Sequence, residues 1–333
     1  MTVLVTGGAG YIGGHTILAL RDAGEQVVVI DDMSNGVPWA VPTEVPFFRA
    51  DIGDAEVVTR VIRDYEVSAV LHFAARLIMP EFYDDPLEYY ATNTAKSCAL
   101  LRVVQDLGIR YFILSSTAAV YGNCPFSPVP ETAPLAPISA YGSSKLMVEK
   151  ILQDVAAVRD LKYAVLRYFN VAGADPQARY GQSSTATSLL VQIAAQVALG
   201  VRPSIEVFGN DYRTRDGTCI RDYVHVTDLV DAHLLALNYL RNGGKNLVAN
   251  CGYGHGYSVK EVLDTVQKVS GRDFVRRIAS RRPGDVVEIF ADANLIRREL
   301  GWKPRYDDLA VIVEHALNWE IQMQKRRIEA TAN

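Results

Sequence analysis

The sequence predicts an α/β protein with a doubly wound parallel sheet and a smaller C-terminal substrate-binding lobe. Short apolar runs recur along the first half of the chain with helical segments between them, at 3–6, 26–30, 46–49, 67–73, 110–115 and 161–167. This alternation is typical of parallel strands joined by crossover helices. A glycine-rich turn directly follows the first run, as in Rossmann-type nucleotide-binding sheets. Both observations predict a ligand site at the carboxyl ends of the strands.

The turn after the first run has the features of a diphosphate site. The apolar run Val3-Leu4-Val5 indicates a buried strand, and Tyr11 to Leu20 indicates a helix. The turn between them brings backbone N–H groups and the positive end of the helix to one point. Its spacing is GxxGxxG, whereas the commoner dinucleotide fingerprint is GxGxxG; a tight turn with glycines kept for packing is the alternative. We assign to the cofactor site Gly7, Gly10, Tyr11, Ile12 and Gly13.

An acidic pair ends the second apolar run. Asp31 and Asp32 follow Ile30, and Asp31 stands eighteen residues after Gly13. A carboxylate at this place can bind the adenosine ribose hydroxyls and would repel a 2′-phosphate. The sequence therefore predicts NAD rather than NADP as the cofactor, with Asp31 on the ribose.

Composition and charge restrict the classes of partner. The chain has 333 residues, a formal net charge of −4 and 22% charged residues, which is ordinary for a soluble protein and offers no basic face to nucleic acid. The longest uncharged stretch, 180–201, is too polar to span a bilayer. The first strand begins so early that we expect no signal peptide. No metal site is expected and a cytoplasmic location is favoured, because four free thiols lie far apart, at Cys98, Cys124, Cys219 and Cys251.

The pattern of the chain changes after about residue 170. Residues 1–170 are expected to form the NAD-binding Rossmann domain, and residues 171–330 a lobe that binds the substrate. Loops rich in Gly, Asp, Arg and Pro separate shorter elements in the second part. Within it, a helix over Leu229 to Leu240 and a strand over Lys245 to Cys251 are expected to rejoin the first domain, so that the segment near 225–251 crosses back.

Polar and small residues gather where the predicted strands end. The carboxyl ends of parallel strands lie along one edge of the sheet, where ligands bind. The cofactor residues expected at this edge are Asp51, Ile52, Phe73, Ala74, Ala75, Ser115 and Tyr168, to which we add Asn35 and Asn93.

Tyr141 and Lys145 are the candidate catalytic pair. They stand four residues apart in YGSSK and so share one face of a helix. The ordinary pKa of tyrosine, near 10, is too high for a base at neutral pH, and a lysine ammonium and a cationic nicotinamide ring would each lower it. Such a tyrosine can take a proton from a substrate hydroxyl during hydride transfer. Thr117, at the end of the fifth strand, could bind the same oxygen or merely cap the strand, and a Tyr-x-x-x-Lys pair alone is usually a solvated helix face.

The motifs together resemble one enzyme family. In order along the chain they are TGGAGYIG, HFAA, SSTAAVYG, YGSSK, LRYFNVAGAD, FGNDY, DGTCIRDYVHVTDL and RRPGD. In combination they resemble the UDP-glucose 4-epimerases of the extended short-chain dehydrogenase/reductase family, from about Val3 to Trp319. The resemblance implies a tightly held NAD, a nucleotide-sugar site in the C-terminal lobe and a homodimer.

The resemblance also implies roles for single residues. It makes Tyr141 the base, places Lys145 on the nicotinamide ribose and Thr117 on the sugar 4-hydroxyl. Ile289 falls where family members carry a residue that lines the sugar pocket. The residues implied to hold the UDP part are Asn170, Phe208, Arg221, Arg282 and Asp285.

Their chemistry agrees with these roles. Arginines are permanently charged donors suited to a diphosphate, Asp285 could accept from ribose hydroxyls, and Phe208 could stack on uracil. Taken singly, each is more often part of a surface ion pair or an aromatic in the core.

Three positions depart from the family pattern. Leu189 and Gln192 stand where relatives commonly carry Asn or His and then Pro, so one polar contact to the nucleotide is expected to be missing. Arg76 stands where relatives often have Lys or a small residue.

We therefore expect NAD-dependent inversion of carbon 4 of a UDP-sugar through a transient 4-keto sugar. UDP-glucose and UDP-galactose are the favoured pair, because the branched Ile289 is expected to leave little room for a 2-acetamido group. A UDP-pentose or UDP-N-acetylhexosamine epimerase is the alternative. A nucleotide-sugar 4,6-dehydratase is disfavoured, because Ala118 and Ala119 replace the acidic pair that such relatives carry after Thr117. A non-catalytic NAD-binding module is disfavoured by the intact catalytic residues.

Overall fold

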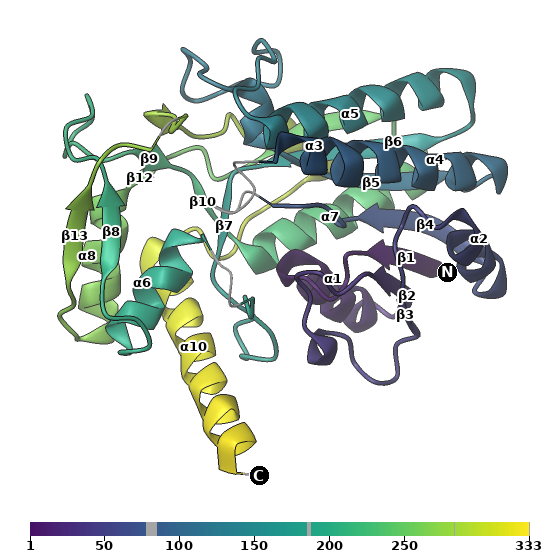
Figure 1. Cartoon of the computed structure of the whole chain (residues 1–333). Coiled ribbons are helices and arrows are strands. Elements are labelled where there is room, and N and C mark those ends of the chain that lie inside the picture. The colour runs from purple at the N-terminus through teal and green to yellow at the C-terminus, as the bar shows by residue number, and fades with distance from the viewer. Residues whose placement is uncertain (78–84, 185–187, 283, 333) are drawn as a thin grey trace.

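The structure is a computed structural model that describes residues 1–77, 85–184, 188–282 and 284–332, the side chains of 328–332 excepted. A larger lobe is built on a seven-stranded sheet, and a smaller lobe lies beside one edge of it (Figure 1). The order of the strands is β11-β6-β5-β4-β1-β2-β3. The strands are β1 Thr2–Thr6, β2 Gln26–Asp31, β3 Phe47–Arg49, β4 Val67–His72, β5 Tyr111–Thr117, β6 Lys162–Tyr168 and β11 Leu247–Cys251.

This sheet confirms the predicted fold class. Every neighbouring pair within it is parallel, and each predicted apolar run overlaps a strand. The chain runs outward from β1 to β3 on one side and from β4 to β6 on the other. The crevice where the order reverses, between β1 and β4, is the ligand position of doubly wound sheets.

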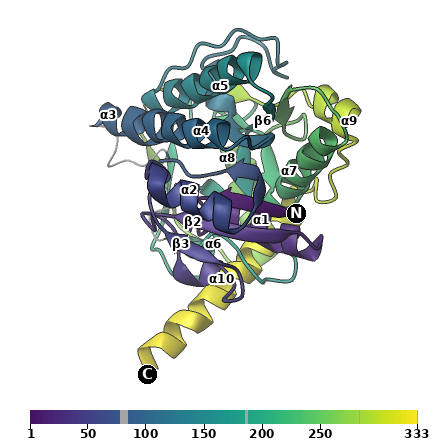
Figure 2. The ribbon, with the colours of Figure 1, turned by 90° about the vertical axis from the view of Figure 1, so that its right-hand side faces the viewer.

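Helices cover both faces of the sheet (Figures 1 and 2). Alternation along β1 explains why: Val3 and Val5 belong to one apolar core, and Leu4 belongs to the other. The first core includes α1 Tyr11–Asp22 and α7 Val226–Arg241. The second includes α2 Ala55–Asp64, α4 Lys96–Asp106 and α5 Ala140–Val158. Short helical segments connect these elements: η1 Pro38–Ala40, α3 Pro86–Tyr89, η3 Tyr90–Ala95 and η4 Ala118–Tyr121.

The smaller lobe combines short strand pairs with packed helices. The strand pairs are β7 with β10, β8 with β13, and β9 between β12 and β14. Their bounds are β7 Asn170–Ala172, β8 Ile205–Phe208, β9 Ile220–Arg221, β10 Tyr223–His225, β12 Tyr257–Ser258, β13 Arg276–Ala279 and β14 Glu288–Ile289. The helices of this lobe are α6 Leu190–Ala198, α8 Val259–Ser270 and α10 Leu309–Ala332, whereas α9 Asn294–Leu300 lies beside α7 (Figure 2). None of the helices in the described ranges is long and apolar enough to cross a membrane.

The two lobes are joined in two ways. The chain crosses back through α7 and β11, and β11 pairs with β6 at the edge of the large sheet. An aromatic cluster of Trp39, Tyr180 and Trp319 also connects them, with ring centroids 5.7–5.9 Å apart. The Tyr180 hydroxyl donates to the carbonyl of Gly10 at 3.2 Å. The smaller lobe is therefore tied directly to the glycine-rich turn.

Candidate active site

The glycine-rich turn packs so closely that side chains are excluded from it. Gly7 has a φ of +70°, and a Cβ there would lie 2.6 Å from the backbone nitrogen of Ala74. A Cβ at Gly13 would lie 2.2 Å from the carbonyl oxygen of Gly7. Gly10 is the N-cap of α1 and has no side chain to occupy the helix end. The first-turn N–H groups, which include those of Tyr11 and Ile12, therefore remain available to a diphosphate.

Asp31 lies at the end of β2, beside this turn. Its Oδ2 accepts a hydrogen bond from Ala9 N at 2.9 Å, and its Oδ1 accepts one from Met33 N at 2.8 Å. Burial raises the pKa of the Asp31 carboxyl, while the two backbone donors favour its charged form. The carboxylate thus holds the turn in shape, and its remaining lone pairs can accept from ribose hydroxyls. These residues fit a dinucleotide.

The other predicted cofactor residues lie at several positions around this edge. The N–H of Phe73 donates to Thr6 O at 3.0 Å, which brings the segment Phe73-Ala74-Ala75 beside the end of β1. Asp51 follows β3, and its Oδ2 lies 2.5 Å from Lys96 Nζ. Ile52 is buried in the second apolar core, and Asn35 is half-buried in the turn after β2.

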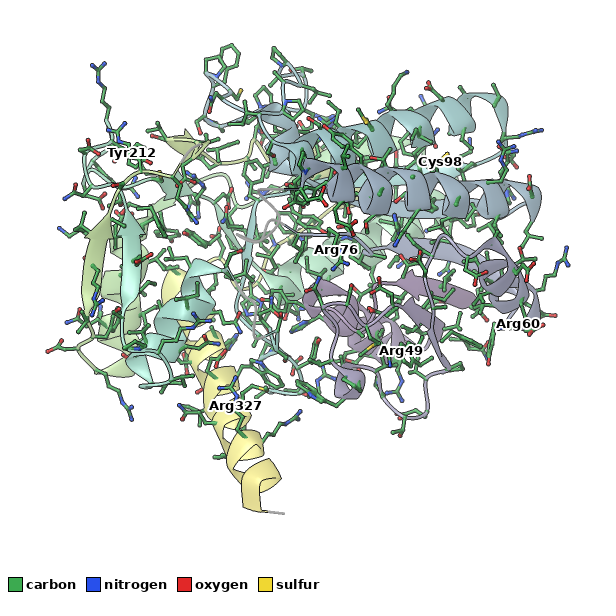
Figure 3. The ribbon with its side chains drawn as sticks, in the orientation of Figure 1. Arg49, Arg60, Arg76, Cys98, Tyr212 and Arg327 are labelled. Carbon is green, nitrogen blue, oxygen red and sulfur yellow. The ribbon has the colours of Figure 1, made fainter. Side chains whose placement is uncertain are left out.

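Asn93 connects two segments of the protein through its carboxamide. Its Oδ1 accepts from Arg76 N at 2.7 Å, and its Nδ2 donates to Ser144 Oγ at 3.1 Å. Arg76 lies near the junction of the two lobes (Figure 3), where its Nε is 3.4 Å from a carboxylate oxygen of Glu88. Asn93 therefore links the segment after β4 to α5, which carries the catalytic pair.

The ends of β5 and β6 meet near Tyr141, the candidate catalytic tyrosine. Thr117 and Tyr168 are partners in the β5–β6 register, and the Tyr168 hydroxyl is hydrogen-bonded to Ser115 Oγ. Thr117 is hydrogen-bonded to Tyr141, and its Oγ1 accepts from Ala119 N at 3.1 Å. Thr117 thus both caps η4 and contacts Tyr141.

Tyr141 and Lys145 share one face of α5, on which Tyr141 is half-buried and Lys145 is buried. Ser139 caps the start of this helix by accepting from Gly142 N at 3.1 Å. Lys145 is only 3% exposed. Among the residues that the structure describes, Lys145 Nζ makes no hydrogen bond, so its donors remain available to a ligand.

The pKa of Tyr141 in the protein alone is governed by burial. Burial raises it to about 12, the hydrogen bond with Thr117 opposes this, and the neighbouring Tyr89 raises it further. Lys145 is not among the groups that lower it. Burial also lowers the pKa of Lys145 to about 8, against the influence of Glu149. In the protein alone, desolvation therefore outweighs the groups that favour the charged form of Tyr141, and a lowering of its pKa by Lys145 and the cofactor stays a prediction.

Four of the five residues implied to hold UDP meet in one cluster of the smaller lobe. The Arg282 guanidinium lies 4.4 Å from the centroid of the Phe208 ring. Arg282 Nε lies 3.2 Å from Asp285 Oδ2, and Arg221 Nη2 lies 3.6 Å from Asp285 Oδ1. These residues come from three separate chain segments, around 208, 221 and 282–285. The cluster combines an aromatic face with two guanidinium groups and one carboxylate, which suits a nucleoside diphosphate.

Ile289 connects this cluster with the segment around Thr117, whereas Asn170 lies beside α6 and α10. Ile289 pairs with Arg221 in the β14–β9 register. It is 7% exposed and belongs to an apolar cluster with Ala118 and Phe169, the neighbours of Thr117 and Asn170. Asn170 begins β7 and lines a narrow cavity beside α6 and α10.

The two departures on α6 lie at the same cavity. Leu189 is the N-cap of α6 and supplies no side-chain cap. The Nε2 of Gln192 donates to Gln182 O and to Glu320 Oε1, each at 3.1 Å. The amide nitrogen of Gln192 is therefore hydrogen-bonded within the protein. Relatives commonly carry a proline at this position.

A buried ion pair behind the catalytic helix was not anticipated. Glu149 and Arg167 are 1% and 3% exposed, and Arg167 Nη2 lies 2.6 Å from Glu149 Oε2. Ser116 Oγ also donates to Glu149. The available signal is the position of Glu149, four residues after Lys145 and eight after Tyr141 on one helix face.

No group of three or more metal-ligating side chains occurs in the part of the chain that the structure describes. The cysteines Cys98, Cys124, Cys219 and Cys251 are free, and Cys98 is exposed on α4 (Figure 3).

The chain resembles known proteins over nearly its whole length. Residues 3–252 match the NAD dependent epimerase/dehydratase family. A UDP-glucose 4-epimerase of Azospirillum brasilense is 51% identical over 97% of this chain and 93% of its own. The solved UDP-glucose 4-epimerase of Stenotrophomonas maltophila, with bound NAD and formylated UDP-arabinopyranose, has a TM-score of 0.94 and 41% identity, covering 98% of this chain and 99% of its own. That of Bifidobacterium longum, in complex with NAD+ and UDP, has a TM-score of 0.91 and 35% identity, covering 97% and 98%.

Proposed function

The chain belongs to the NAD dependent epimerase/dehydratase family, and we propose that it is a UDP-glucose 4-epimerase. It inverts carbon 4 of a UDP-hexose and interconverts UDP-glucose and UDP-galactose. The observation that carries this proposal is the convergence of Thr117 and Tyr141, from β5 and α5, beside a dinucleotide-binding turn.

The catalytic residues divide the work at carbon 4. Tyr141 takes the proton of the 4-hydroxyl and later returns it, and Thr117 binds the same oxygen and orients it. NAD, held by the glycine-rich turn, Asp31 and Lys145, would supply the acceptor and donor of the hydride that leaves carbon 4 and returns to its opposite face. Lys145 binds the nicotinamide ribose, and its ammonium, with the positive charge of the oxidised cofactor, opposes the effect of burial on the Tyr141 pKa. The reaction has no net redox change.

Inversion requires the 4-keto sugar to turn over while the nucleotide stays bound. In our proposal, Arg221 and Arg282 bind the diphosphate, Asp285 the uridine ribose, Phe208 the uracil, and Asn170 the phosphate side of the sugar. Two guanidinium groups in one cluster support a firm grip on UDP. Near the sugar, the apolar Ile289 makes no directional contact, which supports a loosely held ring.

We also propose the organisation and setting of the enzyme. Residues 1–170 bind NAD and residues 171–330 bind the UDP-sugar, with the segment near 225–251 belonging to the first domain. The protein forms a homodimer, a proposal supported by apolar side chains exposed on the neighbouring helices α3 and α5, Leu87 at 74% and Met147 at 46%. It acts in the cytoplasm, in galactose metabolism.

A product assay tests the proposal. The purified enzyme should convert UDP-galactose to UDP-glucose without added NAD, and denaturation should release NAD+ or NADH at about one per chain. Parallel assays with UDP-N-acetylgalactosamine and a UDP-pentose decide among the sugars. Absence of turnover on all three pairs, with NAD still bound, would favour a binding module, and release chiefly of NADP would contradict the role of Asp31.

A further inference from the structure

Glu149 and Arg167 form a charged group directly beneath the catalytic helix face. Glu149 is one helical turn beyond Lys145, and residues four apart on a helix are neighbours. Arg167 Nε lies 3.1 Å from both carboxylate oxygens of Glu149, and its Nη2 lies 2.6 Å from Oε2. In the β5–β6 register Arg167 pairs with Ser116, which donates to the same carboxylate. All three side chains are buried.

The Glu149 carboxylate is therefore hydrogen-bonded to one cation, Arg167, and stands one helical turn from a second, Lys145. Arginine does not lose its proton inside a protein, whereas a buried lysine does so readily. If Glu149 were neutral, the fixed charge of Arg167 and desolvation would both act against the ammonium of Lys145. The influence of Glu149 on Lys145 acts in the opposite direction and supports the charged form.

The remaining groups around Lys145 do not supply this charge. From β4, His72 is buried with its ring nitrogens hydrogen-bonded to Thr6 and Ser97, and burial lowers its pKa to about 3, so it is neutral. From η4, the Tyr121 hydroxyl accepts from Arg167 Nη1 at 3.1 Å.

The two further neighbours come from α5 itself and from α3. Tyr141 stays protonated in the protein alone, since burial raises its pKa to about 12. From α3, Tyr89 packs edge-on against Tyr141, and Glu88 is bound to Arg76 and Thr92.

We propose that Glu149 is a positioning residue, the shared counter-ion that keeps Lys145 protonated beside Arg167. The inference rests on the proposed function only for the use of that ammonium in catalysis. It predicts opposite effects of the two partners. Removing the carboxylate leaves two cations together and lowers the Lys145 pKa, whereas removing the guanidinium leaves the carboxylate to Lys145 alone and raises it.

The test is a 15N NMR titration of the Lys145 Nζ signal in the holoenzyme, identified by its loss in Lys145→Met. Glu149→Gln should lower the pKa of Lys145 by about one unit or more. Arg167→Met should raise it, and the double variant should lie between the two. The alkaline limb of kcat/KM should move in the same directions. Glu25→Gln, which breaks a partly buried ion pair with Arg241 far from α5, should leave the titration unchanged.

A purely structural role would lower melting temperature in both single variants without opposite shifts of the Lys145 titration, and that result would overturn the proposal. Glu149→Gln leaves an uncompensated buried arginine and can unfold the protein. In that case the comparison of Arg167→Met with the neutral double variant decides. The pKa of Lys145 must be higher in Arg167→Met than in the double variant. Equal values would refute the proposal, and because the NMR readout needs no turnover, failure of the proposed epimerase reaction is seen separately.

Discussion

The catalytic part of the site and the nucleotide-anchoring part hold their polar groups differently. Lys145 and Tyr141 are desolvated, and burial shifts both pKa values toward the neutral forms. In the anchoring cluster, the Arg282 side chain is 47% exposed, and Asp285 is 20% exposed and bonded to arginines. One part is assembled to change protonation states, and the other is assembled to remain charged.

This difference shows how the two tasks of an epimerase can be separated. Chemistry at carbon 4 needs a proton to move within a dry environment, where small changes of charge have large effects. In our proposal, retention of UDP relies on the permanent charges of Arg221 and Arg282 near water, which would exchange their contacts with Asp285 for contacts with the ligand. Substitutions in one part should leave the function of the other part nearly unchanged.

Tyr141→Phe should have the largest effect. The variant removes the proton acceptor and keeps the ring, so turnover should fall by roughly 100- to 10,000-fold, as is typical of general-base loss. UDP affinity, measured by calorimetry, should change less than about twofold, because the charged cluster is intact. Near-normal turnover would show that another group accepts the proton.

Acid should destabilise the catalytic lobe. Burial lowers the pKa of His72 to about 3 and of His15 and His233 to about 4. A histidine with a depressed folded pKa contributes stability above its unfolded pKa, near 6.5, and loses it as pH falls. The melting temperature should therefore drop between pH 6.5 and 4. The corresponding loss in the free energy of unfolding is several kcal/mol, at about 1.4 kcal/mol per unit of pKa shift.

His72→Asn is the variant that sharpens this prediction, because it removes the ionisable ring. Its melting temperature should be lower near pH 7 and depend less on pH between 6.5 and 4. A wild-type melting temperature that is flat across this range would contradict the prediction.

Arg282→Ala and Arg221→Ala should affect binding and spare chemistry. Each removes charge-assisted contacts, which are worth about 1.5–3 kcal/mol, so KM for the UDP-sugar should rise by roughly 10- to 100-fold. The effect on kcat should be small, and added salt should raise KM of the wild type. Arg281→Ala is the matched control, since Arg281 stacks on Tyr212 next to this cluster and pairs with Asp211. A loss of kcat as large as the gain in KM would mean that anchoring and chemistry are coupled.

Ile289 should have the smallest effect, on the choice of sugar. We expect good activity on UDP-glucose and UDP-galactose and weak activity on the N-acetylated pair. Ile289→Ala or Ile289→Ser should raise the relative kcat/KM on the N-acetylated pair by about tenfold, and Ile289→Tyr should abolish activity on that pair. The reason is steric, because a larger side chain in the pocket wall overlaps with the 2-acetamido group. An unchanged ratio in all three variants would mean that Ile289 does not face the sugar.

The strands of the large sheet could be predicted from the sequence, since they follow from local patterns of apolar residues. The apolar runs over 26–30 and 161–167 gave strands at the expected places, because burial on both faces of a parallel sheet leaves a continuous apolar run. The meeting of Phe208, Arg221 and Asp285 was implied by resemblance. Local secondary-structure propensity does not predict that these residues meet, because they lie in different loops and short strands.

The pKa shifts and the buried ion pair depend on how deeply each side chain is buried, and they could not be predicted from the sequence. The raised pKa of Tyr141 follows from burial that only the packed helix α5 reveals. Likewise, Glu149 and Arg167 are eighteen residues apart, on a helix and the strand that follows it, and nothing in the spacing identifies them as partners. The amide of Asn93 is directed at Arg76 and Ser144 by the irregular helical segment η3, which a periodic pattern does not specify.

The two backbone contacts of Asp31 constrain how the cofactor preference could evolve. A protein that recruits NADP usually sheds the acidic side chain after its second strand to admit the extra phosphate. Here the same carboxylate also binds the N–H groups of Ala9 and Met33, so its loss would leave two backbone donors unpaired, that of Ala9 buried, and loosen the turn at the helix start. A change of cofactor would require compensating substitutions in the turn at the same time. The choice of NAD is thus protected by the architecture of the loop as well as by charge.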